Sequence, residues 1–136
     1  MKQYVMDSFA MIAFFEDEPG AEAVASLLRQ FLAGTAKGYM SVVNWGEMIY
    51  SLMREQSRKE TEKILRQFEK YPIELVDADR VLTREAANLK ASFRIAYADC
   101  FAAALSLKLN APLVTGDPEF RQLESRISIL WIDAKK

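Results

Sequence analysis

Four acidic residues, Asp7, Glu47, Asp99 and Asp117, stand where a sheet protein places groups that bind ligands. Asp7 ends the first predicted strand, and Asp117 follows the fourth by two residues. Asp99 opens a predicted helix, and Glu47 lies in the first predicted turn of the helix after the second strand. Ligands of open α/β sheets bind outside the carboxyl ends of the strands. We therefore expect the four acids to converge on one rim of a sheet.

Carboxylates gathered at one rim would repel one another, and one or more would take up a proton unless a cation were present. Mg²⁺ and Mn²⁺ are hard cations that bind carboxylate oxygens and water. These ions lower the pKa of a bound water and hold a phosphodiester for in-line attack. Such chemistry requires no imidazole, and the sequence contains no histidine.

The same positions also suit a purely structural role, because Asp is a preferred residue at the N-cap of a helix. Asp7 and Asp117 each precede a predicted helix, and Asp99 stands at the start of one. Asn44 and Glu47 have the spacing of a capping box. Position alone does not separate caps from metal ligands, so both interpretations stay open at this point.

The composition excludes several classes of catalytic site and metal site. With no His and one Cys among 136 residues, Ser-His-Asp triads, Cys-His pairs and the usual Cys/His zinc sites are excluded. The net charge of −1 provides no bulk basicity to hold a nucleic acid. No internal disulfide can form, nothing resembles a signal peptide, and the apolar stretch at 100–107 is too short to cross a membrane. We expect one domain over residues 1–136, in the cytoplasm.

Short apolar runs alternate with segments of helical periodicity along the chain. The apolar runs predict strands at 2–6, 38–42, 72–76, 111–115 and 127–132. The helical spacing predicts helices at 8–15, 21–33, 44–54, 57–70, 79–91, 99–109 and 118–123. This alternation favours an α/β fold, a three-layer α/β/α sandwich with a central parallel sheet.

Four segments together carry a family resemblance. They are Val-Met-Asp-Ser-Phe-Ala at 5–10, Ser-Val-Val-Asn-Trp-Gly-Glu at 41–47, Ala-Tyr-Ala-Asp-Cys-Phe-Ala-Ala-Ala at 96–104 and Leu-Val-Thr-Gly-Asp-Pro-Glu-Phe at 113–120. In this order and at these separations the chain resembles PIN-domain proteins, in particular the VapC toxins of bacterial and archaeal toxin–antitoxin pairs. Met6 and Phe9 depart from the usual residues of that pattern, and we expect neither to touch the chemistry.

The resemblance implies an endoribonuclease that depends on Mg²⁺ or Mn²⁺ and hydrolyses RNA phosphodiesters with a metal-activated water. Asp7, Glu47, Asp99 and Asp117 match the family's catalytic and metal-binding acids, with Asp7 and Asp99 as the most direct ligands. The resemblance further implies a transfer or ribosomal RNA substrate, a cognate antitoxin protein and a homodimer. Two hydroxyl residues match those that orient the acids, namely Ser8 and Thr115.

Other residues and other functions are also considered. Arg94, five residues before Asp99, is a candidate contact to the substrate, whereas Cys100 is expected in the core. The principal alternative is a PIN module that is inactive or not a toxin and serves RNA binding or complex assembly. Phosphoryl transfer on an aspartate is disfavoured because Phe9 stands where an Asp-x-Asp motif needs its second acid. A dinucleotide site is disfavoured because no G-x-G-x-x-G follows the first strand.

Overall fold

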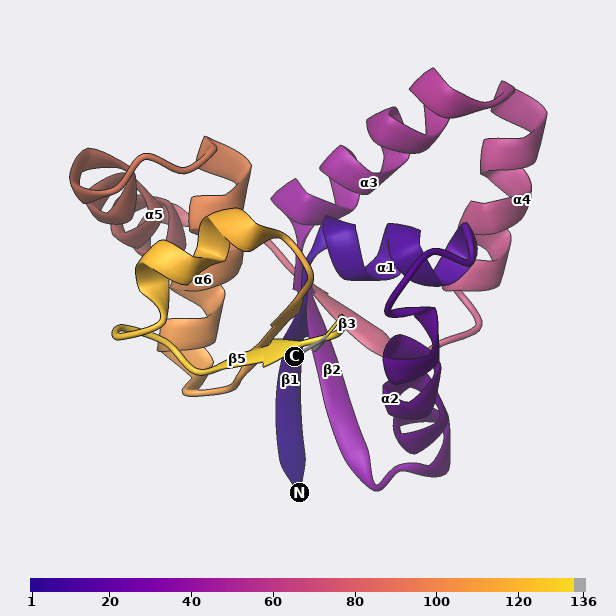
Figure 1. The fold of residues 1–136 in the computed structure, drawn as a ribbon, viewed down its shortest axis with the longest axis horizontal. Helices are drawn as coiled ribbons and strands as arrows, with labels where there is room; N and C mark the ends of the chain where they lie inside the picture. The colour runs from indigo at the N-terminus through magenta and orange to yellow at the C-terminus, as the bar shows by residue number, and fades with distance from the viewer. Residues whose placement is uncertain (134–136) are drawn as a thin grey trace.

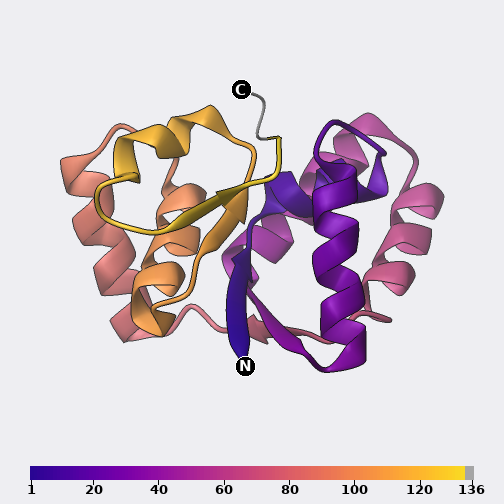
Figure 2. The same cartoon turned by 60° about the horizontal axis from the view of Figure 1, so that its bottom comes forward.

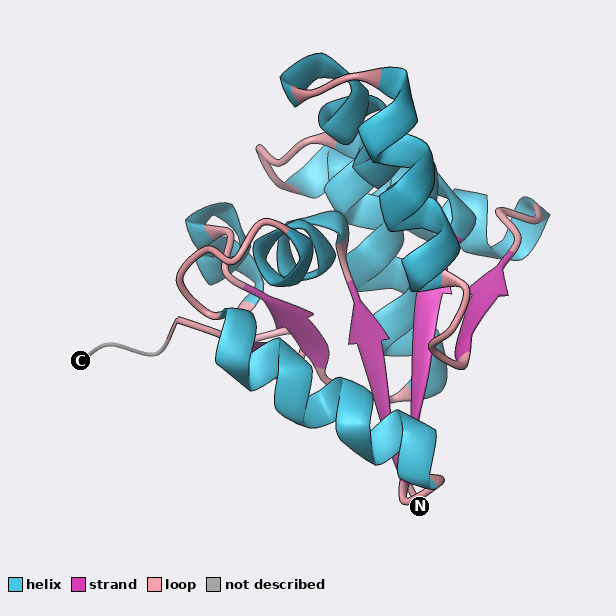
Figure 3. Cartoon of the chain, turned by 90° about the vertical axis from the view of Figure 1, so that its right-hand side faces the viewer, coloured by secondary structure: helices cyan, strands magenta, loops and turns pink. Residues whose placement is uncertain are grey.

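Five parallel strands form one sheet within residues 1–133, the part of the chain that the computed structural model describes. The strands are β1 (Lys2–Met6), β2 (Ala36–Ser41), β3 (Ile73–Val76), β4 (Leu113–Thr115) and β5 (Ile129–Trp131). Their order across the sheet is β3-β2-β1-β4-β5, and each neighbouring pair is parallel. The arrowheads of the strands accordingly point toward the same end of the sheet (Figure 3).

Helices cover both faces of this sheet (Figure 1, Figure 2). They are α1 (Ser8–Phe15), α2 (Ala21–Ala33), α3 (Val42–Glu55), α4 (Arg58–Phe68), α5 (Arg80–Ser92), α6 (Tyr97–Leu109) and the 3₁₀ helix η1 (Pro118–Leu123). One core joins the sheet to α1, α2, α3 and α4, and a second core joins it to α5, α6 and η1. The predicted three-layer α/β/α sandwich is therefore confirmed.

The strand β1 shows why two cores form. Its successive side chains point to opposite faces, so Tyr4 and Met6 enter the first core while Val5 enters the second. On the second face α6 is buried along most of its length, and Ala102 and Ala103 have no exposed surface. Small alanine side chains allow this helix to lie close to the sheet. Because α6 is held so closely, its first turn has a fixed position near the ends of the strands.

The strand order creates a natural crevice between β1 and β4. The chain runs from β1 to β2 and β3 on one side, then returns across the sheet to β4 and β5 on the other. At such a reversal the connections leave the carboxyl ends of two adjacent strands in opposite directions. Asp7 directly follows β1, and Asp117 follows β4 by two residues. The fold therefore brings these two acids to one switch point.

Two of the predicted helices begin at other residues in the structure, and this changes where two of the acids lie. The helix predicted at 44–54 begins instead at Val42, because Ser41 accepts a hydrogen bond from the backbone of Val43 and caps it. Glu47 consequently lies beyond the first turn of α3. The helix predicted at 99–109 begins at Tyr97, so Asp99 lies within its first turn rather than at its cap.

The remaining boundaries differ by a few residues. The strand predicted at 38–42 starts at Ala36, and that predicted at 127–132 is confined to Ile129–Trp131. Of the predicted domain, residues 134–136 lie outside the described residues. Among the helices described, none has the length and apolar character that crossing a membrane requires.

Candidate functional site

Asp7 lies at the centre of the site, where β1 meets α1. Its side chain is 2% exposed, and Oδ1 accepts a hydrogen bond of 2.8 Å from the backbone N–H of Ala10. Thr115, at the end of β4, also hydrogen-bonds the carboxyl group. Burial raises the pKa of Asp7 to about 8, with a smaller contribution from the charges of Asp99 and Asp117. Such a carboxyl group keeps its proton at neutral pH unless a cation replaces it.

Asp99, Asp117 and Glu119 bring one carboxylate oxygen each to within 4.8 Å of one another. Asp99 comes from the first turn of α6, whereas Asp117 and Glu119 come from the start of η1. Burial, followed by the charges of Glu47, Asp117 and Glu119, raises the pKa of Asp99 to about 7. This donor set consists entirely of carboxylate oxygens and suits a hard divalent cation.

Glu47 joins the site from α3 and is held in place by a neighbour. The hydroxyl of Ser8 donates a hydrogen bond of 2.7 Å to Oε1 of Glu47. Asn44, one turn earlier in α3, donates from Nδ2 to the backbone oxygen of Ala98 at 2.9 Å and so ties α3 to the start of α6. Glu47 in turn raises the pKa of Asp99, so the two acids share one electrostatic environment.

Thr115 links two of the acids through one fully buried hydroxyl. Its Oγ1 accepts a hydrogen bond of 3.0 Å from the backbone N–H of Asp117 while the hydroxyl bonds Asp7. Ser8 thus hydrogen-bonds Glu47, and Thr115 hydrogen-bonds Asp7 and the backbone of Asp117. Their assignment as orienting groups in a reaction stays a prediction.

The capping interpretation accounts for two of the four predicted acids. Asp7 caps α1, and Asp117 caps η1 by accepting a hydrogen bond of 3.0 Å from the backbone of Glu119. Asp99 is no cap, because the N-cap of α6 is Ala96, and Glu47 lies in the interior of α3. Capping therefore does not explain why Asp99 and Glu47 approach the others.

A pocket of about 410 Å³ opens over the acids. Its polar lining includes Ser8, Glu47, Asp99, Asp117 and Glu119. Its apolar lining consists of Phe9, Ile12 and Ala96. Asp7 is buried and does not line this pocket.

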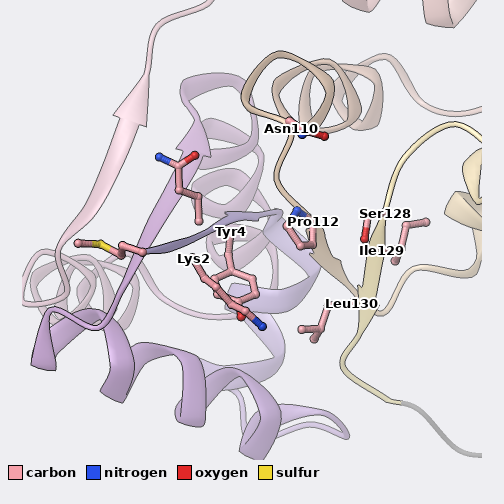
Figure 4. A pocket seen from close by; sticks show the side chains of 9 residues that line it. Lys2, Tyr4, Asn110, Pro112, Ser128, Ile129 and Leu130 are labelled. Atoms are coloured by element: carbon pink, nitrogen blue, oxygen red, sulfur yellow. The ribbon is translucent and has the colours of Figure 1, made fainter.

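A second pocket, of about 510 Å³, lies at the opposite end of the sheet (Figure 4). Its lining includes Lys2, Tyr4, Pro112 and Leu130 and contains no carboxylate side chain. This pocket therefore offers no carboxylate oxygen to a hard divalent cation. Among the described residues, the carboxylate oxygens that converge tightly enough to hold a metal ion lie instead near the carboxyl ends of β1 and β4.

The structure also adds to the predicted site and changes one expectation. Glu119 was missed, although its position two residues after Asp117 on a helical turn could have indicated it. Phe9, expected to lie away from the chemistry, lines the acidic pocket. Arg94 is exposed and does not line that pocket, and its backbone pairs with the side chain of Gln122. Cys100 is buried, as predicted.

A family model described as the PIN domain matches residues 4–126. The chain therefore belongs to the PIN-domain family, as the sequence resemblance indicated. A comparison with curated proteins finds no significant match.

Several solved structures share the fold over nearly the whole chain. VapBC2 from Rickettsia felis, bound to a promoter DNA fragment, is 18% identical with a TM-score of 0.72, covering 95% of this chain and 98% of that one. DNA-bound VapBC from Salmonella typhimurium is 15% identical with a TM-score of 0.73, covering 97% and 99%. VapC20 from Mycobacterium tuberculosis, described as a toxin that cleaves the sarcin-ricin loop, is 11% identical with a TM-score of 0.72, covering 94% and 98%. At these identities the likeness establishes the fold.

Proposed function

We propose that this chain is a divalent-metal-dependent endoribonuclease and acts as the toxin of a toxin–antitoxin pair. The observation that carries the proposal is the cluster of Asp99, Asp117 and Glu119 oxygens at the sheet's switch point, with Asp7 buried beneath it and Glu47 beside it. Membership of the PIN-domain family supports a nuclease, and the similarity to VapC20, described as a toxin that cleaves the sarcin-ricin loop, supports RNA as the substrate.

The residues present fit Mg²⁺ or Mn²⁺. Asp99, Asp117 and Glu119 offer the converging oxygens, while Asp7 and Glu47 lie close enough to add to the negative potential around them. Burial, together with the neighbouring negative charges, raises the pKa of Asp7 and of Asp99, so a divalent cation at this site would favour their ionised forms. A bound cation would supply charge neutralisation on the phosphodiester and lower the pKa of the attacking water.

The chain's own groups would orient and accept protons around that reaction. Ser8 holds Oε1 of Glu47, which leaves Oε2 to take a proton from water. Thr115 and the backbone of Ala10 hold Asp7 against rotation. The apolar wall formed by Phe9 and Ile12 limits the water that reaches the reacting groups from one side.

The partner of such a toxin would be a cognate antitoxin protein. Structures with the same fold are described as VapBC-1 from nontypeable Haemophilus influenzae and as a toxin–antitoxin complex from Klebsiella pneumoniae. The family resemblance of the sequence further supports a homodimer and a transfer or ribosomal RNA substrate as parts of this proposal. Such a substrate places the proposed activity in the cytoplasm.

The proposal is tested by incubating the purified chain with transfer RNA and ribosomal RNA in EDTA, then in Mg²⁺ or Mn²⁺. We expect cleavage with a metal ion alone, and a loss of at least about 100-fold in Asp99→Asn. Asp77→Asn is the matched control, because Asp77 also follows a strand of the sheet but is exposed and lies outside the acidic group. Equal cleavage by wild type and Asp99→Asn would contradict the proposal. Binding of RNA without cleavage would favour an inactive PIN module instead.

A further inference from the structure

Phe9 occupies an unusual place for a large apolar side chain. It is the second residue of α1, its side chain is 40% exposed, and it lines the same pocket as Asp99 and Asp117. Within residues 1–133, the other exposed large hydrophobic side chains do not line this pocket. An apolar ring thus stands beside the acidic cluster, where water rather than protein meets its free surface.

The ring of Phe9 is fixed by close packing against Gly116. A Cβ atom added to Gly116 would lie 2.5 Å from Cε1 of Phe9 and 3.2 Å from Cγ1 of Ile132. The ring therefore rests directly on the backbone that precedes Asp117. This contact covers one side of the ring and leaves the rest open toward the pocket.

An exposed aromatic ring beside an acidic cluster suits the base of a nucleotide. The face of an aromatic ring is negative and carries no ligand oxygen, so Phe9 neither attracts the neighbouring carboxylates nor coordinates a divalent cation. A nucleobase, by contrast, stacks on aromatic side chains, and this stacking tolerates any base. Bases in a duplex have both faces covered by their neighbours, so a protein ring can stack only on an unpaired base.

We propose that Phe9 is the stacking platform for the nucleobase adjacent to the phosphate at the acidic cluster, and so positions the RNA for cleavage. This inference rests on the proposed ribonuclease activity and adds a substrate-positioning residue to it. The phosphate faces the charged wall of the pocket, and the neighbouring base lies against the apolar wall of Phe9 and Ile12.

The test begins with wild-type cleavage of an oligoribonucleotide, used to map the cleaved bond, in single-stranded form and in a duplex. Phe9→Leu keeps the apolar bulk and removes the ring, and we expect its kcat/KM on the single strand to fall by about 5-fold to 100-fold. Phe9→Trp keeps a ring and should stay within about 3-fold of wild type. Tyr50→Leu removes an aromatic side chain of similar exposure outside the pocket and should cleave as wild type does.

An abasic substrate separates stacking from a structural effect. Removing the base next to the cleaved bond should lower wild-type kcat/KM by about the same factor as Phe9→Leu, and should cost Phe9→Leu little more. Equal losses in both proteins on the abasic substrate, or wild-type activity in Phe9→Leu, would overturn the inference while leaving the ribonuclease proposal intact. Faster cleavage of the duplex than of the single strand would also overturn it. No RNA cleavage by wild type would instead refute the proposed function, and the inference with it.

Discussion

The hydroxyl of Ser8 lies 2.7 Å from Oε1 of Glu47 and donates a hydrogen bond that joins the start of α1 to α3. The two residues are 39 positions apart in the sequence. Asn44 also donates from Nδ2 to the same oxygen, at 3.5 Å. The two bonds hold Glu47 near Asp99, whose pKa the charge of Glu47 raises.

Removing this hydrogen bond should slow the reaction without unfolding the chain. In Ser8→Ala we expect kcat for RNA cleavage to fall by about tenfold, because a hydrogen bond to a charged group contributes about 1.5 kcal/mol or more. KM should change little, since the role proposed for Glu47 is to take a proton from the reacting water rather than to bind the RNA. Steady-state kinetics would measure the two constants separately.

Two variants control this prediction. Ser8→Thr retains a hydroxyl at the first position of α1 and should recover most of the activity. Ser26→Ala removes an exposed hydroxyl on α2 and should have no effect. A fall in Tm of Ser8→Ala large enough to explain the lost activity would show that the bond is structural only.

Glu119 should contribute to metal binding although the family pattern did not assign it. In Glu119→Gln we expect Mn²⁺ affinity to fall by at least about tenfold, the loss that even the outer partners of a metal site cause when removed. Glu18→Gln is the matched control, because Glu18 lines the same pocket but lies outside the group of converging oxygens. Isothermal titration with Mn²⁺ would compare them, and equal affinities would remove Glu119 from the site.

The pKa of Asp7 makes the stability of the metal-free chain depend on pH. Burial raises this pKa from 3.8 to about 8 in the folded chain. Between these values the folded chain keeps a proton that the unfolded chain has released. The free energy of unfolding should therefore fall as the pH rises from about 4 to about 8, and Asp99, with a pKa of about 7, acts in the same direction.

Thermal unfolding in EDTA would measure this effect. Asp7→Asn cannot ionise, so its Tm should exceed that of wild type by about 3 °C or more at pH 8 and by much less at pH 4.5. Mn²⁺ binds the ionised carboxylates, so it should raise the Tm of wild type more at pH 8 than at pH 6. A wild-type Tm that increases between pH 5 and pH 8 without metal would contradict the prediction.

The order of elements could be read from the sequence because local patterns determine it. Buried strands and amphipathic helices have different periodicities, and these were distinct enough to predict every strand within residues 1–133. The start of α3 could not be read in this way, because Ser41 and Asn44 are both good caps. A contact across 54 residues, from Asn44 to Ala98, settles that Asn44 is buried inside the helix.

Part of the candidate site could likewise be predicted from the sequence, and part could not. Asp7 and Asp117 could be placed together because each follows a strand of a parallel sheet. The convergence of Glu119 depends on the turn of η1, and the place of Phe9 depends on its packing against Gly116. Both arise from backbone geometry that the spacing of residue types does not specify.

Alanine substitutions at two glycine positions should change the free energy of unfolding in opposite directions. Gly38 lies in β2, where an added Cβ would come within 2.4 Å of Cε2 of Phe31 on α2. Gly46 lies in the interior of α3, and an added Cβ there would meet no heavy atom within 4 Å. We expect Gly38→Ala to lower the free energy of unfolding by about 1–3 kcal/mol through overpacking. Gly46→Ala should raise it by about 0.5–1 kcal/mol, because alanine favours the helix.

Urea unfolding of both variants would measure these free energies against wild type. Phe31 is buried in the core between β2 and α2, so its ring cannot move into solvent without exposing apolar surface. The clash in Gly38→Ala must therefore be relieved by shifting α2 away from the sheet. If Gly38→Ala proved as stable as wild type, α2 would pack less tightly on β2 than the contact with Phe31 requires. If Gly46→Ala were destabilised, the open space beside α3 would have to be occupied by another group.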